Sequence, residues 1–332
     1  MIAGRTNAPG LRHGLLLQMK RVRVLEETIA ARYGEQKMRC PVHLSIGQEA
    51  VSAGVGLALQ TTDLAVSGHR AHAHYIAKGG SMRRMVAEIY GKATGCSRGK
   101  GGSMHLIDES VGFKGSTAIV GGTIPVGTGL ALSIKRKKTG QIACVFFGDA
   151  AVEEGVFYES ANFAALHGLP VLFLCENNLY SVYSPLAVRQ PPGRAIHEMV
   201  AGMGITTVAG DGNDPDTVHS LSSEAAASIR AGRGPVFLEF TTYRWREHCG
   251  PNFDNDIGYR SQEEFLEWQS RDPIRCYERR LLETGAVLPA DIAEMDRAVA
   301  EEVAAAFAFA EASPFPAPED AATDVFFREK LP

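Results

Sequence analysis

Five short apolar runs recur along the chain with helical patterns between them, and this alternation limits the folds that the sequence can adopt. The runs lie at 63–68, 142–147, 170–175, 205–210 and 235–243. Strands that alternate with helices form a mostly parallel sheet, because each helix carries the chain back across the sheet. We therefore predict an α/β fold, with an open, mostly parallel sheet, helices on both faces and a helical C-terminal tail.

The sequence predicts a single domain over residues 1–332, because it shows no internal repeat and no low-complexity linker. A helix is expected at about 11–34, where apolar residues fall on one face and Gly34 suits a C-terminal cap. The helical tail is expected at about 262–332. Glycines and other small residues crowd 91–129, which predicts a long irregular loop, functional or disordered, that enters a helix near Ile124.

Composition and charge restrict the classes of function. The chain is 45% hydrophobic and 22% charged with a net charge of -4, so no basic field argues for nucleic acid or an anionic membrane. Its apolar runs are shorter than the roughly 20 residues of a membrane helix. The six cysteines are scattered without a C-x-x-C pair, as in proteins of a reducing compartment. We expect a soluble, cytoplasmic protein that acts on small molecules, without nucleic-acid or membrane partners.

Two of the apolar runs are followed by short polar side chains. Asp149 follows the run at 142–147, and Asn178 follows the run at 170–175. The segment between them is helical, so the two strands are parallel and the two side chains leave the sheet at its ligand-binding edge. A carboxylate, an amide oxygen and a loop carbonyl would suit Mg²⁺ and a diphosphate. Alternatively, Asp149 caps the following helix and Asn178 belongs to a turn.

Motifs over nearly the whole chain resemble the α subunits of thiamine diphosphate-dependent 2-oxo acid and acetoin dehydrogenase complexes. Gly148-Asp149 and the later Asn177-Asn178 resemble the cofactor motif of that family. Further matching segments are HLSIGQEA at 43–50, GHRAHAHYIAKG at 68–79, GKGGSMHL at 99–106, GFKGSTAIVGGTIPVGTGLAL at 112–132, GPVFLEFTTYRW at 234–245, SRDPI at 270–274 and EASPFP at 311–316. The resemblance implies three Mg²⁺ ligands: the side chains of Asp149 and Asn178 and the backbone carbonyl of Tyr180.

The resemblance also implies which residues hold the cofactor. Arg70 matches an arginine that reaches the diphosphate, whereas His69 stands where the family usually has tyrosine. Ala118 and Val120 match positions whose backbone meets the aminopyrimidine ring, and Val182 matches the bulky residue that supports the bent cofactor. The expected cofactor-binding residues are His69, Arg70, Ala118, Val120, Gly148, Asp149, Ala150, Ala151, Asn178, Tyr180, Val182 and His248.

Histidines are the candidate catalytic residues. His248 aligns with a family histidine on a mobile loop that touches the cofactor phosphate and lines the active-site mouth; alternatively it is an ordinary loop histidine. His43 and His72, each within a matching segment, are the other candidates. The spacing of His69, His72 and His74 alone suggests zinc, but no cysteine or acidic fourth ligand stands near.

Further positions depart from the family pattern. Ala150 replaces the usual third glycine of the cofactor motif, and Glu153-Glu154 stand where pyruvate and acetoin relatives have NQG. Cys249 stands at the regulatory phosphoserine of mitochondrial pyruvate relatives, so control by phosphorylation at that position is absent. The departures leave the substrate open.

The resemblance implies an enzyme subunit that uses thiamine diphosphate and Mg²⁺ to decarboxylate a 2-oxo acid or cleave acetoin. The acyl or aldehyde unit would pass to an acceptor such as lipoamide. Because the chain has room for one cofactor-binding module, a β subunit is expected in an α2β2 heterotetramer, with a lipoyl acyltransferase as a further partner. A biosynthetic carboligase subunit and a non-catalytic scaffold subunit are the alternatives. Activity of the chain alone would make Glu49 the candidate catalytic carboxylate.

Overall fold

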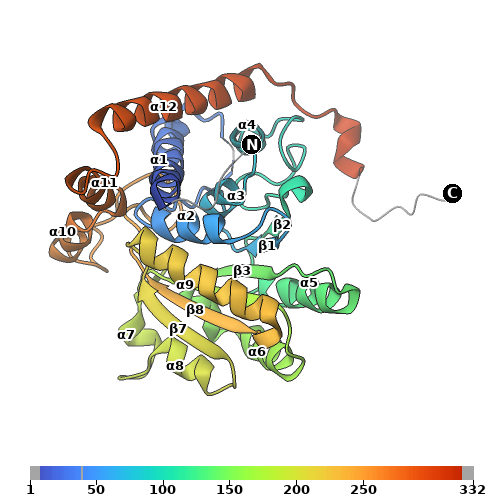
Figure 1. The fold of residues 1–332 in the computed structure, drawn as a ribbon. Helices are drawn as coiled ribbons and strands as arrows, with labels where there is room; N and C mark the ends of the chain where they lie inside the picture. The colour runs from blue at the N-terminus through green and yellow to red at the C-terminus, as the bar shows by residue number, and fades with distance from the viewer. Residues whose placement is uncertain (1–7, 39, 324–332) are drawn as a thin grey trace.

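The computed structural model describes residues 8–38 and 40–323, and its centre is a six-stranded sheet of order β2-β1-β3-β4-β8-β7 (Figure 1). The strands are β1 (Leu64–Ser67), β2 (Phe113–Ser116), β3 (Ala143–Gly148), β4 (Val171–Asn177), β7 (Thr206–Asp211) and β8 (Val236–Thr241). Every pairing between them is parallel. The predicted fold class is confirmed.

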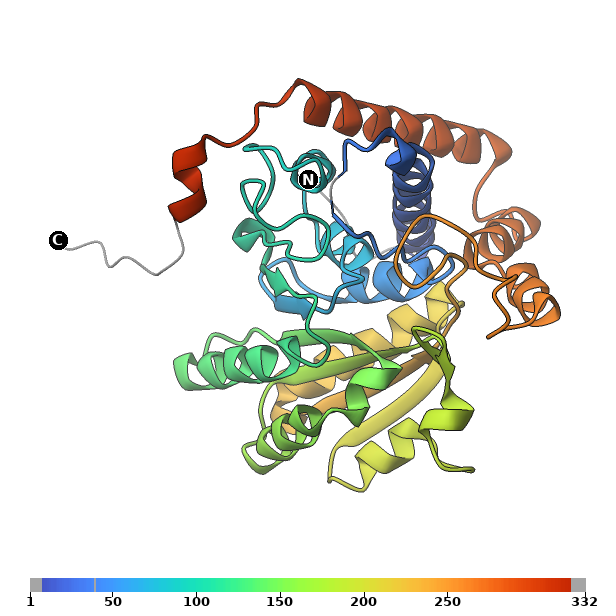
Figure 2. The ribbon, with the colours of Figure 1, turned by 180° about the vertical axis from the view of Figure 1, so that it is seen from behind.

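Helices cover both faces of this sheet, as Figures 1 and 2 show. Those on one face are α5 (Thr123–Lys137), α6 (Gly155–Leu166) and α8 (Ile196–Ala201), and those on the other are α2 (Glu49–Ala58), α3 (His72–Ala77) and α9 (Pro215–Ser228). Alternate residues of β4 enter separate cores: Leu172 and Leu174 on one side, Val171, Phe173 and Cys175 on the other. Because both faces are buried, the strands read as continuous apolar runs.

A further layer of helices stands on the α2 side of the sheet. It comprises α1 (Ala8–Arg32), α4 (Met82–Ile89), α10 (Gln262–Ser270), α11 (Pro273–Glu283) and α12 (Pro289–Ala312). The C-terminal helix α12 runs across α1 and α4 (Figure 1). None of the described helices combines the length and the apolar character that crossing a bilayer requires. The predicted tail is helical to Ala312 and ends, within the described residues, in a 3-10 turn at Pro318–Ala322.

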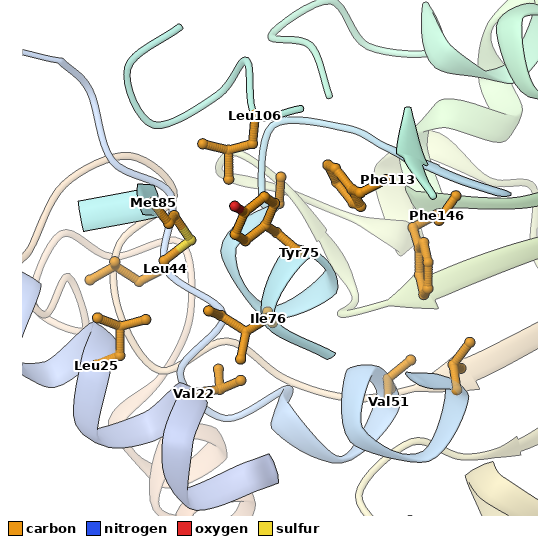
Figure 3. Close-up of a cluster of buried hydrophobic side chains, with 14 of the residues drawn as sticks. Val22, Leu25, Leu44, Val51, Tyr75, Ile76, Met85, Leu106, Phe113 and Phe146 are labelled. Carbon is orange, nitrogen blue, oxygen red and sulfur yellow. The ribbon is translucent and has the colours of Figure 1, made fainter. Parts of the chain in front are cut away.

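The larger core joins this layer to the sheet. Figure 3 shows Val22 and Leu25 of α1 close to Ile76 of α3, all of them buried. The ring of Tyr75 meets Phe113 of β2 edge-on, with centroids 5.5 Å apart. These contacts hold the N-terminal helix against the edge of the sheet that carries β1 and β2.

Two details differ from the sequence prediction. A 3-10 turn at Tyr33–Glu35 continues α1, and the left-handed residue that ends it is Gln36 (φ 58°). The predicted cap at Gly34 is therefore wrong, since that glycine lies inside the extra turn. Strand β2 lies within the segment 91–129 that was predicted to be irregular; it is a four-residue edge strand containing a glycine, so it carries little periodic signal.

Helix α5 approaches the sheet closely because of Gly127. A Cβ atom at this position would lie 2.2 Å from Cγ2 of Val145 and 3.1 Å from Cγ2 of Val66. Gly129, in the same helix, faces open space, with nothing within 4 Å of an added Cβ. The two glycines therefore separate the effect of close packing from that of backbone entropy.

We expect Gly127→Ala to destabilise the chain by about 1–3 kcal/mol, because the methyl group overpacks the contact with β3. Gly129→Ala should be neutral or stabilising by up to about 1 kcal/mol, because alanine restricts the unfolded chain without a clash. Urea unfolding of both variants measures the difference. Equal midpoints for the two would contradict the close packing of α5 on the sheet.

Candidate functional site

The parallel pairing of β3 with β4 brings the two predicted polar residues to one edge of the sheet. Gly148 lies opposite Glu176 in this pair, and Asp149 and Asn178 follow just beyond. A cavity opens here, and every predicted cofactor-binding residue except Ala118 lines it. Ligands bind at this carboxyl edge in open α/β sheets.

Asp149 is buried with a cationic partner. It is 1% exposed, and one carboxylate oxygen accepts a hydrogen bond from Arg189, the last residue of α7 (Leu186–Arg189). Burial raises the pKa of Asp149, and the Arg189 guanidinium opposes that rise. The N-cap of α6 is Glu154, and its side chain makes no capping bond. The alternative role of Asp149, as the cap of that helix, is thus absent.

Asn177 and Asn178 form a turn at the end of β4. The side-chain oxygen of Asn177 accepts a hydrogen bond from the Leu179 amide (3.1 Å), and that of Asn178 accepts one from the Tyr180 amide (3.3 Å). The Asn178 amide donates to Oε1 of Gln48 at 3.0 Å. The turn role is therefore present, and it aims Asn178 and Tyr180 at the cavity instead of excluding them from it.

The chain then enters a small hairpin of β5 (Tyr180–Ser181) and β6 (Ser184–Pro185). Val182 between them has φ 53°, in the left-handed region that a β-branched residue rarely adopts. Its carbonyl accepts a hydrogen bond from Arg244 at 2.6 Å. Backbone strain of this kind persists only where surrounding contacts enforce it, and it often occurs at ligand sites.

Arg70 lies beside the histidines of the cavity. Its guanidinium is buried and donates to the carbonyls of Leu44 (2.5 Å) and His248 (3.4 Å). Burial first, and Arg70 second, lower the pKa of His248 to about 3 and that of His69 to about 4. Both rings are therefore neutral at physiological pH. His43 does not line the cavity, but its ring centroid is 5.0 Å from that of His248.

His72 and His74 lie in different surroundings although both belong to α3. His72 is fully buried away from the cavity, with its ring nitrogens 3.2 Å from Glu26 Oε1 and 2.8 Å from Ser103 Oγ. His74 lines the cavity, and its Nε2 lies 3.2 Å from a Glu176 oxygen. The structure thus places His74 at the site and His72 in the protein interior.

Several residues that the sequence analysis did not assign to the site also belong to it, among them Gln48, His74, Glu176 and Arg189. Gln48 and His74 fall inside segments that resemble the family, so the motifs carried a signal for them. Glu176 lies within an apolar strand and looks like a surface residue in sequence. Arg189 lies in a short helix, forty positions beyond its partner, and no local pattern indicates that pairing.

Glu49 is a structural residue. Its carboxylate is completely buried and accepts hydrogen bonds from Arg23 and from the Gly47 amide (3.0 Å). It does not line the cavity. The hypothesis of a catalytic carboxylate at Glu49 is not supported by this placement.

Glu49→Gln should destabilise the chain towards the lower end of the ~3–5 kcal/mol typical of breaking a buried ion pair, because Arg23 keeps Asp272 as a second partner. Chemical denaturation of the two forms measures this change. Glu35→Gln is the matched control, since Glu35 pairs with Arg32 at the surface, and should leave the midpoint nearly unchanged. A stable Glu49→Gln variant would contradict the structural role.

The model of the family described as dehydrogenase E1 component matches residues 17–319. Pyruvate dehydrogenase E1 component subunit alpha of Rickettsia bellii is 39% identical over 305 residues, covering 92% of each chain. The same subunit of Rhizobium meliloti is 36% identical over 309 residues, covering 93% of this chain and 88% of the relative.

A relative named for a different activity is equally similar. The subunit alpha of acetoin:2,6-dichlorophenolindophenol oxidoreductase from Bacillus subtilis is 37% identical over 312 residues, covering 93% of this chain and 91% of the relative. The matched region includes the whole cavity. The chain therefore belongs to the dehydrogenase E1 component family, as an alpha-type subunit of its thiamine diphosphate-dependent enzymes.

Proposed function

We propose that the chain is the alpha subunit of an enzyme that uses thiamine diphosphate and Mg²⁺ to decarboxylate a 2-oxo acid or to cleave acetoin. The acyl or aldehyde unit passes to an acceptor such as lipoamide, with a lipoyl acyltransferase as a further partner. The observation that carries the proposal is the convergence of Asp149, Asn178 and Tyr180 at the carboxyl edge of adjacent parallel strands, in one cavity with Arg70.

The donor set fits Mg²⁺. Asp149 offers a carboxylate oxygen, Asn178 an amide oxygen and Tyr180 a backbone carbonyl, all of them hard oxygen ligands. The Arg189 guanidinium already neutralises the Asp149 carboxylate, so this position accepts a cation. We propose that Mg²⁺ takes the place of that guanidinium. Gln48 supports the set, because its hydrogen bond fixes the orientation of the Asn178 amide.

Arg70 and the histidines of the cavity suit the diphosphate. Arg70 is buried there and supplies a permanent positive charge, and neutral His69 and His248 supply hydrogen-bond donors. Ala150 and Ala151 leave space beside the metal ligands, since both line the cavity with small side chains. The charge and the size of these residues thus complement the diphosphate group.

Thiamine diphosphate, when bound, supplies the electron sink for the carbanion. The chain's own residues bind and orient the cofactor, and they exclude water from the cavity. Val182 and Val120 contribute apolar surface to the cavity for the organic rings. We propose His248 as the histidine that contacts substrate, able to accept or donate a hydrogen bond in its neutral form. We propose that His43, which does not line the cavity, acts through its contact with the His248 ring. His72 is left out of this set because its ring nitrogens are both engaged elsewhere.

A β-type subunit completes the active site in this proposal. The described residues contain one six-stranded sheet, and one edge of that sheet carries the proposed diphosphate site. The carboxylates that line the cavity already have partners, Arg189 for Asp149 and His74 for Glu176. The partner would supply the glutamate that faces the aminopyrimidine, in an α2β2 assembly. We further propose a single domain over 1–332 and a cytoplasmic location, the latter consistent with the absence of disulfides among the described cysteines.

Asp149→Ala should weaken thiamine diphosphate binding in the presence of Mg²⁺ by at least about 10- to 100-fold, the loss that even a residue supporting a metal ligand can cause. Calorimetry on the assembled complex measures the affinity. Glu153→Gln is the control, because Glu153 also pairs with Arg189 but does not line the cavity. Unchanged affinity in Asp149→Ala would rule out the metal site.

The purified chain, supplied with cofactor and Mg²⁺, should show no turnover until a β-type subunit is added. Without the β subunit, the chain lacks the glutamate that faces the aminopyrimidine and loses a general acid-base contribution of roughly 10²–10⁴-fold. The cavity wall that the partner would cover is also open to solvent, which weakens the electrostatic stabilisation of the transition state. The assay follows consumption of several 2-oxo acids and of acetoin with an artificial electron acceptor, using a preparation free of host β subunits. Robust turnover by the chain alone would overturn the two-subunit proposal.

A further inference from the structure

Three histidine rings from distant parts of the sequence meet beside Arg70. His43 precedes α2, His69 follows β1, and His248 lies in the segment after β8. Their ring centroids are 4.5 Å (His43 to His69), 5.0 Å (His43 to His248) and 5.2 Å (His69 to His248) apart. One ring nitrogen of each lies within 4.8 Å of the corresponding atoms of the other two.

These rings have unused hydrogen-bonding capacity. Nδ1 of His43 is buried without a partner, and this residue is 7% exposed. Within the ranges 8–38 and 40–323, no hydrogen bond joins any of the three rings to another residue. A buried polar nitrogen without a partner costs free energy, so a ligand that engages it is stabilised.

The protonation state of the rings suits metal binding. Burial, followed by the charge of Arg70, lowers the pKa of His43 to about 2, and the same two causes act on His69 and His248. Each ring is therefore neutral and keeps a free lone pair, the form in which histidine binds metals. The backbone is non-helical at all three positions.

We propose that His43, His69 and His248 form a binding site for a borderline transition-metal ion such as Zn²⁺ or Co²⁺ in the cofactor-free chain. Three imidazoles with an open fourth position are an established coordination set for such ions. With metal-nitrogen bonds of about 2.0–2.1 Å, tetrahedral geometry needs ring nitrogens about 3.3 Å apart, so the rings draw together on binding. His69 supplies the third imidazole ligand, at a position where the family usually has tyrosine.

Arg70 shapes the affinity of this site in two ways. It donates to the carbonyl of His248 and to that of Leu44, next to His43, so it holds two of the three ligand segments in place. Its charge repels a dication, which an anionic fourth ligand such as hydroxide or chloride offsets. Mg²⁺ is not expected here, because it prefers oxygen ligands.

Metal and cofactor should exclude each other at these rings, a consequence that rests on the proposed function. His69 and His248 line the same cavity as Asp149, and their nitrogens cannot bind a transition metal and donate to a diphosphate at once. Occupation by Zn²⁺ would thus hold the chain in a form that cannot take its cofactor.

The site is tested by titrating Co²⁺ into the full chain, prepared without a histidine tag and stripped of metal by a chelator. One equivalent should bind and produce the visible absorption of four-coordinate Co²⁺. His69→Tyr, which introduces the usual family residue, and His248→Gln should each weaken binding by at least about 10- to 100-fold. The control His105→Asn, at an exposed histidine whose Nδ1 lies 3.3 Å from the Gly101 carbonyl, should bind Co²⁺ like the parent chain.

Unchanged Co²⁺ affinity in both His69→Tyr and His248→Gln, with circular dichroism confirming that they fold, would overturn the metal site. An equal loss in His105→Asn would do so too, since binding would then be non-specific. Thiamine diphosphate and Mg²⁺ added to the Co²⁺-loaded complex with a β-type subunit should release the ion. Binding of the cofactor without release would overturn the exclusion, whereas failure of the metal-free complex to bind cofactor would count against the proposed function.

Discussion

The parallel register of β3 and β4 decides where the chemistry of this chain can lie. Because Gly148 stands opposite Glu176, the residues that follow the two strands emerge together, and a slip of one residue would turn each side chain to the opposite face. The alternation of Leu172 and Phe173 into separate cores prevents that slip. The packing of the sheet thus positions both Asp149 and Asn178.

The surroundings of the cavity are built from segments far apart in the sequence. Gln48 comes from the start of α2, Arg70 from the end of β1, and Val182 from the hairpin after β4. The buried Arg244 links the hairpin to the segment that carries His248, because it bonds both Val182 and the Arg246 carbonyl. A substitution in either loop therefore affects the shape of the same cavity.

Sequence patterns predicted the strands and the main helices because each is a run with its own periodicity or apolar content. They failed where contacts between distant parts of the chain determine the local structure. The edge strand at Phe113–Ser116 has no periodic pattern, and the extra turn after α1 overrode a plausible glycine cap at Gly34. The candidate cofactor residues came from motifs, and most of them line the cavity. Which of His72 and His74 faces the cavity depends on the rotation of a short helix, and the pairing of Arg189 with Asp149 depends on the path of the chain after β4.

Under the proposed function, the pairing of Arg189 with Asp149 makes cation uptake an exchange. The cavity wall holds one positive group against the carboxylate before any ion arrives, so under the proposed function the charge beside Asp149 rises by one unit instead of two when Mg²⁺ enters. The driving force is then a difference in free energy between two cations beside Asp149. One is the free ion Mg²⁺, and the other is the Arg189 guanidinium, which α7 tethers to the chain. Displacing Arg189 leaves Glu153 and Gln190, its neighbours in the same hydrogen-bonded cluster, to be rearranged. The conformation of residues 186–190 would consequently report the ionic state of the cavity, and a spectroscopic label there could follow loading in real time.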